Sequence, residues 1–157
     1  MPITREEFRH ALGRFASGVT VVTTRAADGH LHGLTVSAFC AVSLEPPLIL
    51  ICIQKTTGSH HAFEESKMFV VNILTESQTH LSNHFASFVE DKFTGIEYDE
   101  NGAGLPVLKD ALVNLECRLV NSYDGGDHTI FVGQIERAHV SDGKPLAYFY
   151  GSYRQLN

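Results

Sequence analysis

The chain has 157 residues, of which 43% are hydrophobic and 19% charged, and its formal net charge is −6. This composition is ordinary for one globular domain, and the acidic charge argues against a nucleic-acid partner or an anionic membrane surface. The longest apolar run, Pro46–Ile53, is too short to cross a bilayer, and the first residues hold no apolar stretch of the signal-peptide kind. We expect a single domain over residues 1–157, with no membrane partner and no nucleic-acid partner.

The three cysteines, Cys40, Cys52 and Cys117, are scattered through apolar, strand-like stretches. An odd, scattered set of this kind is typical of buried, reduced thiols. The expected location of the protein is therefore the cytoplasm.

A helix is predicted near the start of the chain. Thr4 and Glu7 form a capping box, and the apolar residues that follow repeat at helical spacing, which predicts a helix over 5–16 that has ended by Gly18. The residues from 19 to 24 are Val and Thr only, so a strand should follow.

Further strands are expected in the next thirty residues. Asp28–Gly29 is a hairpin-turn signal, and strands are predicted at 34–36 and 41–44. After the break at Pro46–Pro47, the continuous apolar run Leu48–Ile53 is typical of a strand buried on both faces.

The remaining elements are shorter helices, a loop and long strands. Ser59 is the expected N-cap of a short helix. The sequence predicts a helix at 59–66, a strand at 69–74, a helix at 76–88, a long loop at 90–110, strands at 113–123 and 129–140 joined by a turn at 124–127, and a last aromatic segment at 148–153.

These elements favour a mainly β fold. Six or seven strands and two or three short helices do not alternate regularly, so a doubly wound parallel sheet is not expected. A mostly antiparallel barrel with a few short flanking helices fits the pattern better.

Several familiar catalytic and metal-binding motifs are missing from the sequence. There is no dinucleotide-binding G-x-G-x-x-G after a strand, no phosphate loop, no nucleophile elbow and no C-x-x-C pair. Among nine histidines, His80 and His84 share one face of a predicted helix, but no glutamate lies between them. We interpret the histidines as solvated side chains and expect no metal.

Three polar segments are candidates for ligand binding. Gly33–Phe39 could offer hydroxyl and backbone N–H groups to a polar ring edge, Gln54–Ser59 could bind an anion, and Gly126–Gly133 places a histidine at the start of a strand. Each segment also has a plain structural interpretation: β-forming residues, a capped turn and an exposed histidine.

Taken in order, these and further segments resemble the short-chain flavin reductases, the reductase components of two-component flavin-dependent monooxygenases. The resemblance covers nearly the whole chain. It is carried by Phe15–Thr24, Gly33–Phe39, Val42–Leu48, Phe69–Leu74, Asp91–Phe93, Gly126–Gly133 and Pro145–Phe149. It implies an FMN-binding split β-barrel that forms a homodimer, with the flavin near the subunit interface.

The resemblance also implies the residues that contact the cofactors. The expected flavin-binding residues are Thr35, Val36, Ser37, Ala38, Cys52, Ile53, Gln54, Ser59, Lys92 and Phe93. The last three would lie toward the phosphate. His128 would line the nicotinamide side and is the expected catalytic residue. Ser37–Ala38 stands where many relatives carry two polar residues, which removes one side chain from the ring contact.

The implied function is hydride transfer from NADH or NADPH to FMN or FAD, with FMN slightly preferred, and supply of reduced flavin to a partner monooxygenase. The cofactors carry this chemistry, which agrees with a sequence that contains no recognisable triad. Two alternatives remain open at this point. One is an electron carrier or oxidase of the same barrel with fixed FMN, and the other is a haem-binding split-barrel module without turnover.

Overall fold

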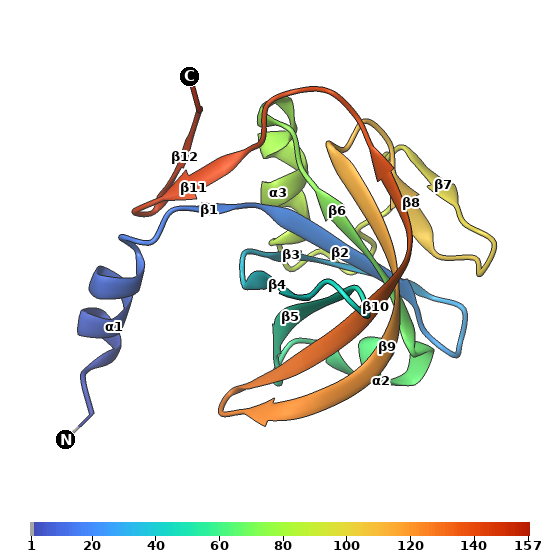
Figure 1. The fold of residues 1–157 in the computed structure, drawn as a ribbon, viewed down its shortest axis with the longest axis horizontal. Helices are drawn as coiled ribbons and strands as arrows, with labels where there is room; N and C mark the ends of the chain where they lie inside the picture. Colours follow the sequence, from blue (N-terminus) through green and yellow to red (C-terminus); the bar gives the residue numbers. More distant parts are fainter. Residues whose placement is uncertain (1) are drawn as a thin grey trace.

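The computed structural model describes residues 2–157 and has a mainly β architecture (Figure 1). Its centre is a seven-stranded antiparallel sheet in the order β3-β2-β6-β9-β10-β5-β4. These strands are β2 (Thr20–Arg25), β3 (Leu31–Val36), β4 (Phe39–Ser43), β5 (Leu48–Gln54), β6 (Met68–Ile73), β9 (Val113–Gly125) and β10 (His128–Val140).

The two edge strands of this sheet, β3 and β4, are consecutive in the sequence and are joined only by Ser37–Ala38. Three Cα–Cα steps limit the separation of Val36 and Phe39 to about 11 Å. The sheet is therefore strongly curved, because its first and last strands must meet at this point.

The β-branched stretch predicted as the second element forms β2, where every residue from Thr20 to Thr24 is buried. Buried hydroxyls need acceptors. Thr20 donates to the carbonyl of Val36 at 2.6 Å, Thr23 to that of Pro106 at 2.6 Å and Thr24 to that of Met68 at 2.7 Å. The threonines thus tie neighbouring elements to β2.

The helices are shorter than predicted. The capping box of Thr4 and Glu7 is present, but α1 (Arg5–Leu12) ends at Gly13 instead of residue 16. Gly18 belongs to the short strand β1 (Ser17–Gly18). The segment predicted as one helix from residue 76 is a 3-10 turn, η1 (Glu76–Gln78), followed by α3 (Thr79–Phe85).

Helix α2 (His60–Ser66) lies where a helix was predicted. Ser59 occupies its N-cap position, but its side chain makes no capping hydrogen bond. Its hydroxyl lies 3.0 Å from Nδ1 of His32 instead.

Two predictions about burial were wrong. In β5 only Ile49, Ile51 and Ile53 are buried and the residues between them are half-buried, because alternate side chains of a strand point to opposite faces and only one face of β5 packs on the core. Of the cysteines only Cys117 is buried, and burial raises the pKa of its thiol to about 12.

The predicted long loop contains a small hairpin, β7 (Tyr98–Glu100) and β8 (Pro106–Leu108). A separate three-stranded sheet joins β1 to β11 (Ala147–Phe149) and β12 (Ser152–Arg154). This sheet and α1 lie to one side of the main sheet in Figure 1. No helix in the described part of the chain has the length and apolar character needed to cross a membrane.

Candidate functional site

Two adjoining cavities lie between the edge strand β3 and the end of β5. The smaller, of about 230 Å³, is lined by residues 34–38, residues 52–54, Thr57 and His128. The larger, of about 560 Å³, extends from Leu31 to the residues that follow α3. The two share Leu34, Thr35, Gln54 and Thr57, so they form one groove.

The groove brings together ten of the eleven residues that the sequence predicted for the site. Those that line the smaller cavity are Thr35, Val36, Ser37, Ala38, Cys52, Ile53, Gln54 and His128. Ser59 and Lys92 line the larger cavity. Because these residues come from five separate segments, the fold alone creates their proximity.

Phe93 lines neither cavity. It is buried, with its ring centroid 5.3 Å from that of Phe85 and 5.4 Å from that of Tyr98, in edge-on contacts. An apolar ring of this size is more stable inside such an aromatic cluster than in a polar groove.

The end of β3 offers mainly backbone groups to the smaller cavity. Val36 and Ile53 are buried, so their side chains face the core. The Thr35 hydroxyl donates to the carbonyl of Ser82 at 2.5 Å and can only accept a hydrogen bond from a ligand. Ser37 and Ala38 are exposed, and the carbonyl of Ala38 accepts from the N–H of Cys52 at 3.0 Å.

Lys92 is the only lysine or arginine that lines this groove within residues 2–157. Its ammonium donates to the carbonyls of Phe85 at 2.8 Å and Gly33 at 3.2 Å. Burial lowers the pKa of this ammonium. An ammonium has three donors, so one N–H is left for an anion.

His128 opens β10 opposite Gln54 of β5. Its Nδ1 lies 2.7 Å from a carboxylate oxygen of Asp127, and this hydrogen bond lowers the pKa of the Asp127 carboxyl. When Nδ1 carries the proton toward the carboxylate, Nε2 is the ring nitrogen left for a ligand. Lys55, in the predicted anion-binding turn, is paired with Asp124 of β9.

Sequence reasoning missed the apolar wall of the larger cavity. Phe85, Phe88 and Val89 line it, although Phe85 was interpreted only as a helix residue. A Cβ on Gly33 would lie 2.6 Å from the Phe85 ring, so glycine is needed for this close approach. The pairing of a strand glycine with an aromatic residue distant in sequence leaves no signal in a single sequence.

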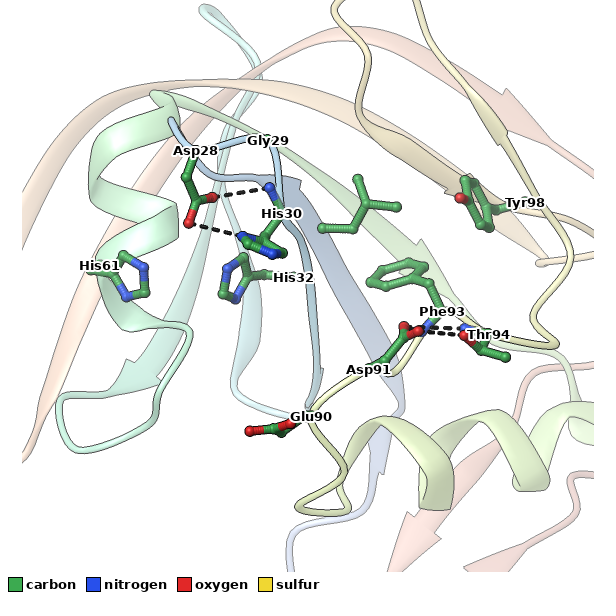
Figure 2. Close-up of a pocket in the computed structure, with 11 residues that line it drawn as sticks. Asp28, Gly29, His30, His32, His61, Glu90, Asp91, Phe93, Thr94 and Tyr98 are labelled. Atoms are coloured by element: carbon green, nitrogen blue, oxygen red, sulfur yellow. Dashed lines mark hydrogen bonds and ion pairs between the residues drawn. The ribbon is translucent and has the colours of Figure 1, made fainter.

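A third cavity, of about 920 Å³, continues the groove past Lys92 (Figure 2). It shares Leu31, His32 and Glu90 with the larger groove cavity. We call it the histidine cavity, and its lining is Asp28, Gly29, His30, Leu31, His32, His61, Glu90, Asp91, Phe93, Thr94 and Tyr98.

Among the ionisable groups of the histidine cavity, Asp28 and His30 form an ion pair. Nδ1 of His30 lies 2.9 Å from an Asp28 carboxylate oxygen, which raises the pKa of His30. The rings of His32 and His61 meet edge-on with 5.4 Å between centroids. No three His, Cys, Asp or Glu side chains in residues 2–157 are arranged to hold a metal ion.

Comparison with known proteins relates this chain to flavin reductases by family model, by sequence and by structure. The family model described as "flavin reductase like domain" matches residues 12–157. The reductase component of a 4-nitrophenol 4-monooxygenase/4-nitrocatechol 2-monooxygenase from Rhodococcus opacus is 40% identical over 152 residues, covering 97% of this chain and 81% of that protein.

Two further relatives carry more specific names. An FMN reductase (NADH) from Agrobacterium fabrum is 40% identical, over 96% of this chain and 85% of that protein. The crystal structure of an NADH:FAD oxidoreductase from Streptomyces globisporus, in complex with NAD and FAD fragments, is similar with a TM-score of 0.93 and 33% identity, over 98% of this chain and 93% of that one.

Proposed function

The chain belongs to the flavin reductase like family, and on that premise we propose that it transfers a hydride from NADH or NADPH to FMN or FAD and supplies reduced flavin to a partner monooxygenase. The observation that carries this proposal is the convergence of residues predicted for flavin contact on one groove between β3 and β5.

The residues of the groove fit a flavin. A flat, polar-edged ring suits the smaller cavity, where Ser37, Ala38 and Gln54 present polar groups beside the half-buried Cys52. A phosphate suits the larger cavity, where Lys92 has an unused donor and the Ser59 hydroxyl lies on the lining. When bound there, the flavin would supply the hydride-accepting chemistry, which belongs to the cofactor pair.

The protein's own part is to bind, orient and exclude water. Lys92 would fix the phosphate end, and the backbone around Ser37–Ala38 would orient the ring. His128, held by Asp127, would position the nicotinamide at the mouth of the smaller cavity. No general acid or base is required of any residue in this scheme.

The proposal extends to the architecture. The curved sheet, whose edge strands β3 and β4 are consecutive, supports a split barrel formed by residues 1–157 as one domain.

Helix α1 has no buried residue, and it exposes Phe8 and Leu12 on one face. Such an apolar face supports a homodimer in which α1 packs on the second copy. The three unpaired cysteines support a cytoplasmic location.

The test is to follow oxidation of NADH and NADPH by the purified protein, with and without added FMN or FAD. Turnover that scales with free flavin is expected. Bound flavin with no nucleotide oxidation would instead favour a carrier or oxidase with fixed FMN. Haem binding without any flavin binding would favour the non-enzymatic module, and either result would refute the proposal.

A further inference from the structure

A chain of hydrogen bonds connects the C-terminal hairpin of β11 and β12 to the groove. The hydroxyl of Tyr153, on β12, lies 2.7 Å from the hydroxyl of Ser82 on α3 and donates to the side-chain carbonyl of Asn83 at 2.9 Å. A tyrosine hydroxyl has one proton, so Ser82 is the donor in its bond to Tyr153. The backbone carbonyl of Ser82 accepts from the hydroxyl of Thr35, which lines both cavities of the groove. The hairpin is thus linked to the middle of the groove.

The bond between Tyr153 and Ser82 holds the middle of α3 against the hairpin. Ser82 is only 1% exposed, so its hydroxyl depends on Tyr153 and not on water for an acceptor. The end of α3 is held separately, because Lys92 donates to a carbonyl there. The backbone of Thr35 is fixed by the pairing of β3 with β2, where it lies opposite Val21. The contact with Tyr153 therefore helps to fix the Ser82 carbonyl relative to the Thr35 hydroxyl.

The direction of these bonds decides what Thr35 offers to a ligand. Its hydroxyl proton is used on the Ser82 carbonyl, so its oxygen can only accept. In the proposed arrangement the ribityl chain, which joins the flavin ring to the phosphate, crosses the lining that the two cavities share, and Thr35 is part of that lining. Ribityl hydroxyls are donors, and an acceptor already turned toward them binds more tightly than a hydroxyl that must first rotate.

We propose that Tyr153 is a positioning residue of the flavin site, which anchors α3 through Ser82 so that the Thr35 hydroxyl accepts from the ribityl chain. The inference rests on the proposed function, because it requires a flavin in the groove. It concerns the affinity for the sugar-alcohol part of the flavin, whereas Lys92 concerns the phosphate. It gives a role in binding to β11 and β12, whose residues line neither cavity of the groove.

The experiment measures the dissociation constants of FMN, riboflavin and lumiflavin, which lacks the ribityl chain, by quenching of flavin fluorescence without any nicotinamide nucleotide. Tyr153→Phe removes only the hydroxyl and keeps the ring packed against the core. FMN and riboflavin should bind about 3- to 10-fold more weakly, the net effect of one hydrogen bond between uncharged groups. Lumiflavin should bind as it does to wild type, which a general loosening of the site would not allow.

Variants of Thr35 test whether the two residues act together. Thr35→Val keeps the shape and removes the acceptor, so it should weaken FMN and riboflavin by at least as much as Tyr153→Phe does. Thr35→Ser keeps the hydroxyl and should retain most of the wild-type affinity. The double variant Tyr153→Phe, Thr35→Val should bind no more weakly than Thr35→Val alone, because no hydroxyl is then left to position.

Tyr148→Phe is the matched control from the same hairpin. The ring centroid of Tyr148 lies 5.4 Å from that of Tyr153, but its hydroxyl has no hydrogen-bond partner among residues 2–157. This variant should change none of the three dissociation constants. Ser82→Ala removes the bond to Tyr153 from its other end and is judged by the same three constants if Tyr153→Phe does not fold.

Unchanged affinities for FMN and riboflavin in Tyr153→Phe would overturn the inference. So would an equal loss of lumiflavin affinity, or additive effects of Tyr153→Phe and Thr35→Val. The proposed function is tested separately by NADH oxidation with added FMN in the wild-type protein. Its failure is absence of that turnover, whereas the inference fails on flavin affinities measured without the nucleotide.

Discussion

At the scale of single residues, His128 combines a fixed ring with an open position at the groove. Its hydrogen bond to Asp127 sets which ring nitrogen faces a ligand. Replacing His128 by Ala should slow hydride transfer at saturating NADH by about 10- to 100-fold, the cost of a misplaced reactant. Flavin affinity should change less than the rate.

Single-turnover stopped-flow measurements of flavin reduction test this prediction. Asp127→Asn keeps the ring but weakens its orientation, so its rate should fall between those of wild type and His128→Ala. An unchanged rate in His128→Ala would remove this residue from the mechanism.

Lys92 has two roles that can be separated by choice of ligand. Its ammonium links the carbonyls of Gly33 and Phe85, and it is also the proposed phosphate contact. Lys92→Met keeps the apolar stem and removes a charge-assisted bond of about 1.5–3 kcal/mol. FMN affinity should fall about 10- to 100-fold.

Riboflavin, which has no phosphate, is the control ligand for Lys92→Met. Its affinity should not change if the ammonium contacts the phosphate. An equal loss of FMN and riboflavin affinity would show that Lys92 acts only by holding the wall of the groove.

The lowered pKa of His32 predicts that the stability of the protein changes with pH in a definite direction. Burial is the main cause that lowers its folded-state pKa, helped by His61 and His30 and opposed by Asp28 and Glu65. The unfolded chain therefore binds more protons than the folded one below the ordinary histidine pKa of about 6.5. Its contribution to the free energy of unfolding is fully present above pH 6.5 and is lost as the pH falls toward the lowered pKa.

His30 has the opposite effect, because Asp28 raises its pKa. The stability that the pair of His30 and Asp28 contributes is present below pH 6.5 and is lost as the pH rises through the raised pKa of His30. Chemical denaturation of wild type, His32→Asn and His30→Asn across this range separates the two. If the free energy of unfolding of His32→Asn changed with pH in parallel with that of wild type, the contribution assigned to His32 would be contradicted.

At the scale of elements, Asn72 of β6 connects three parts of the fold. Its amide donates to the carbonyl of Val21 at 2.9 Å, and its carbonyl accepts from the N–H of Leu108 at 3.1 Å and from Asn114 at 2.8 Å. All these groups are in the buried interior, where an unpaired polar group costs about 1–3 kcal/mol.

Asn72→Ala should therefore lower the free energy of unfolding by about 3 kcal/mol or more, as measured by urea denaturation. Asn121→Ala is the matched control, because Asn121 is exposed on β9 and its side chain bonds only to neighbours on its own strand. A loss in Asn72→Ala as small as that in the control would show that β8 is held by other contacts.

The hydrogen bonds of Asn72 also explain why the sequence did not predict the hairpin β7–β8. Residues 98–100 and 106–108 carry little alternation, and their pairing is fixed by Asn72 and by Thr23, which lie far away in sequence. Local signals did predict other elements well. The capping box of α1 and the Asp28–Gly29 turn depend on neighbouring residues only, and both are present.

At the scale of the whole molecule, the groove was predictable through family resemblance, because the order of its segments along the chain is distinctive. The histidine cavity was not predictable from the sequence. Its walls come from the β2–β3 turn, α2 and the segment around Asp91, and the three histidines looked like solvated side chains. Only the folded chain places these rings beside the groove.

The proposed homodimer also concerns the whole molecule, because it depends on the exposed apolar side of α1. Phe8, Leu12 and Phe15 are spaced to share one side of α1 and its continuation, and they are 55%, 53% and 79% exposed. Since α1 buries no residue in its own chain, the double variant Phe8→Glu, Leu12→Glu should fold normally. Light scattering after gel filtration should give twice 17.3 kDa for wild type and 17.3 kDa for the variant.

Arg9→Gln is the control on the same helix, because it changes charge and leaves the apolar side intact. It should remain a dimer, since the expected contact depends on apolar burial. A wild-type mass of 17.3 kDa would refute the homodimer, and a dimeric double variant would place the interface elsewhere. In that case the exposed apolar residues Val42 and Leu44, beside the groove strand β5, would be the next surface to substitute.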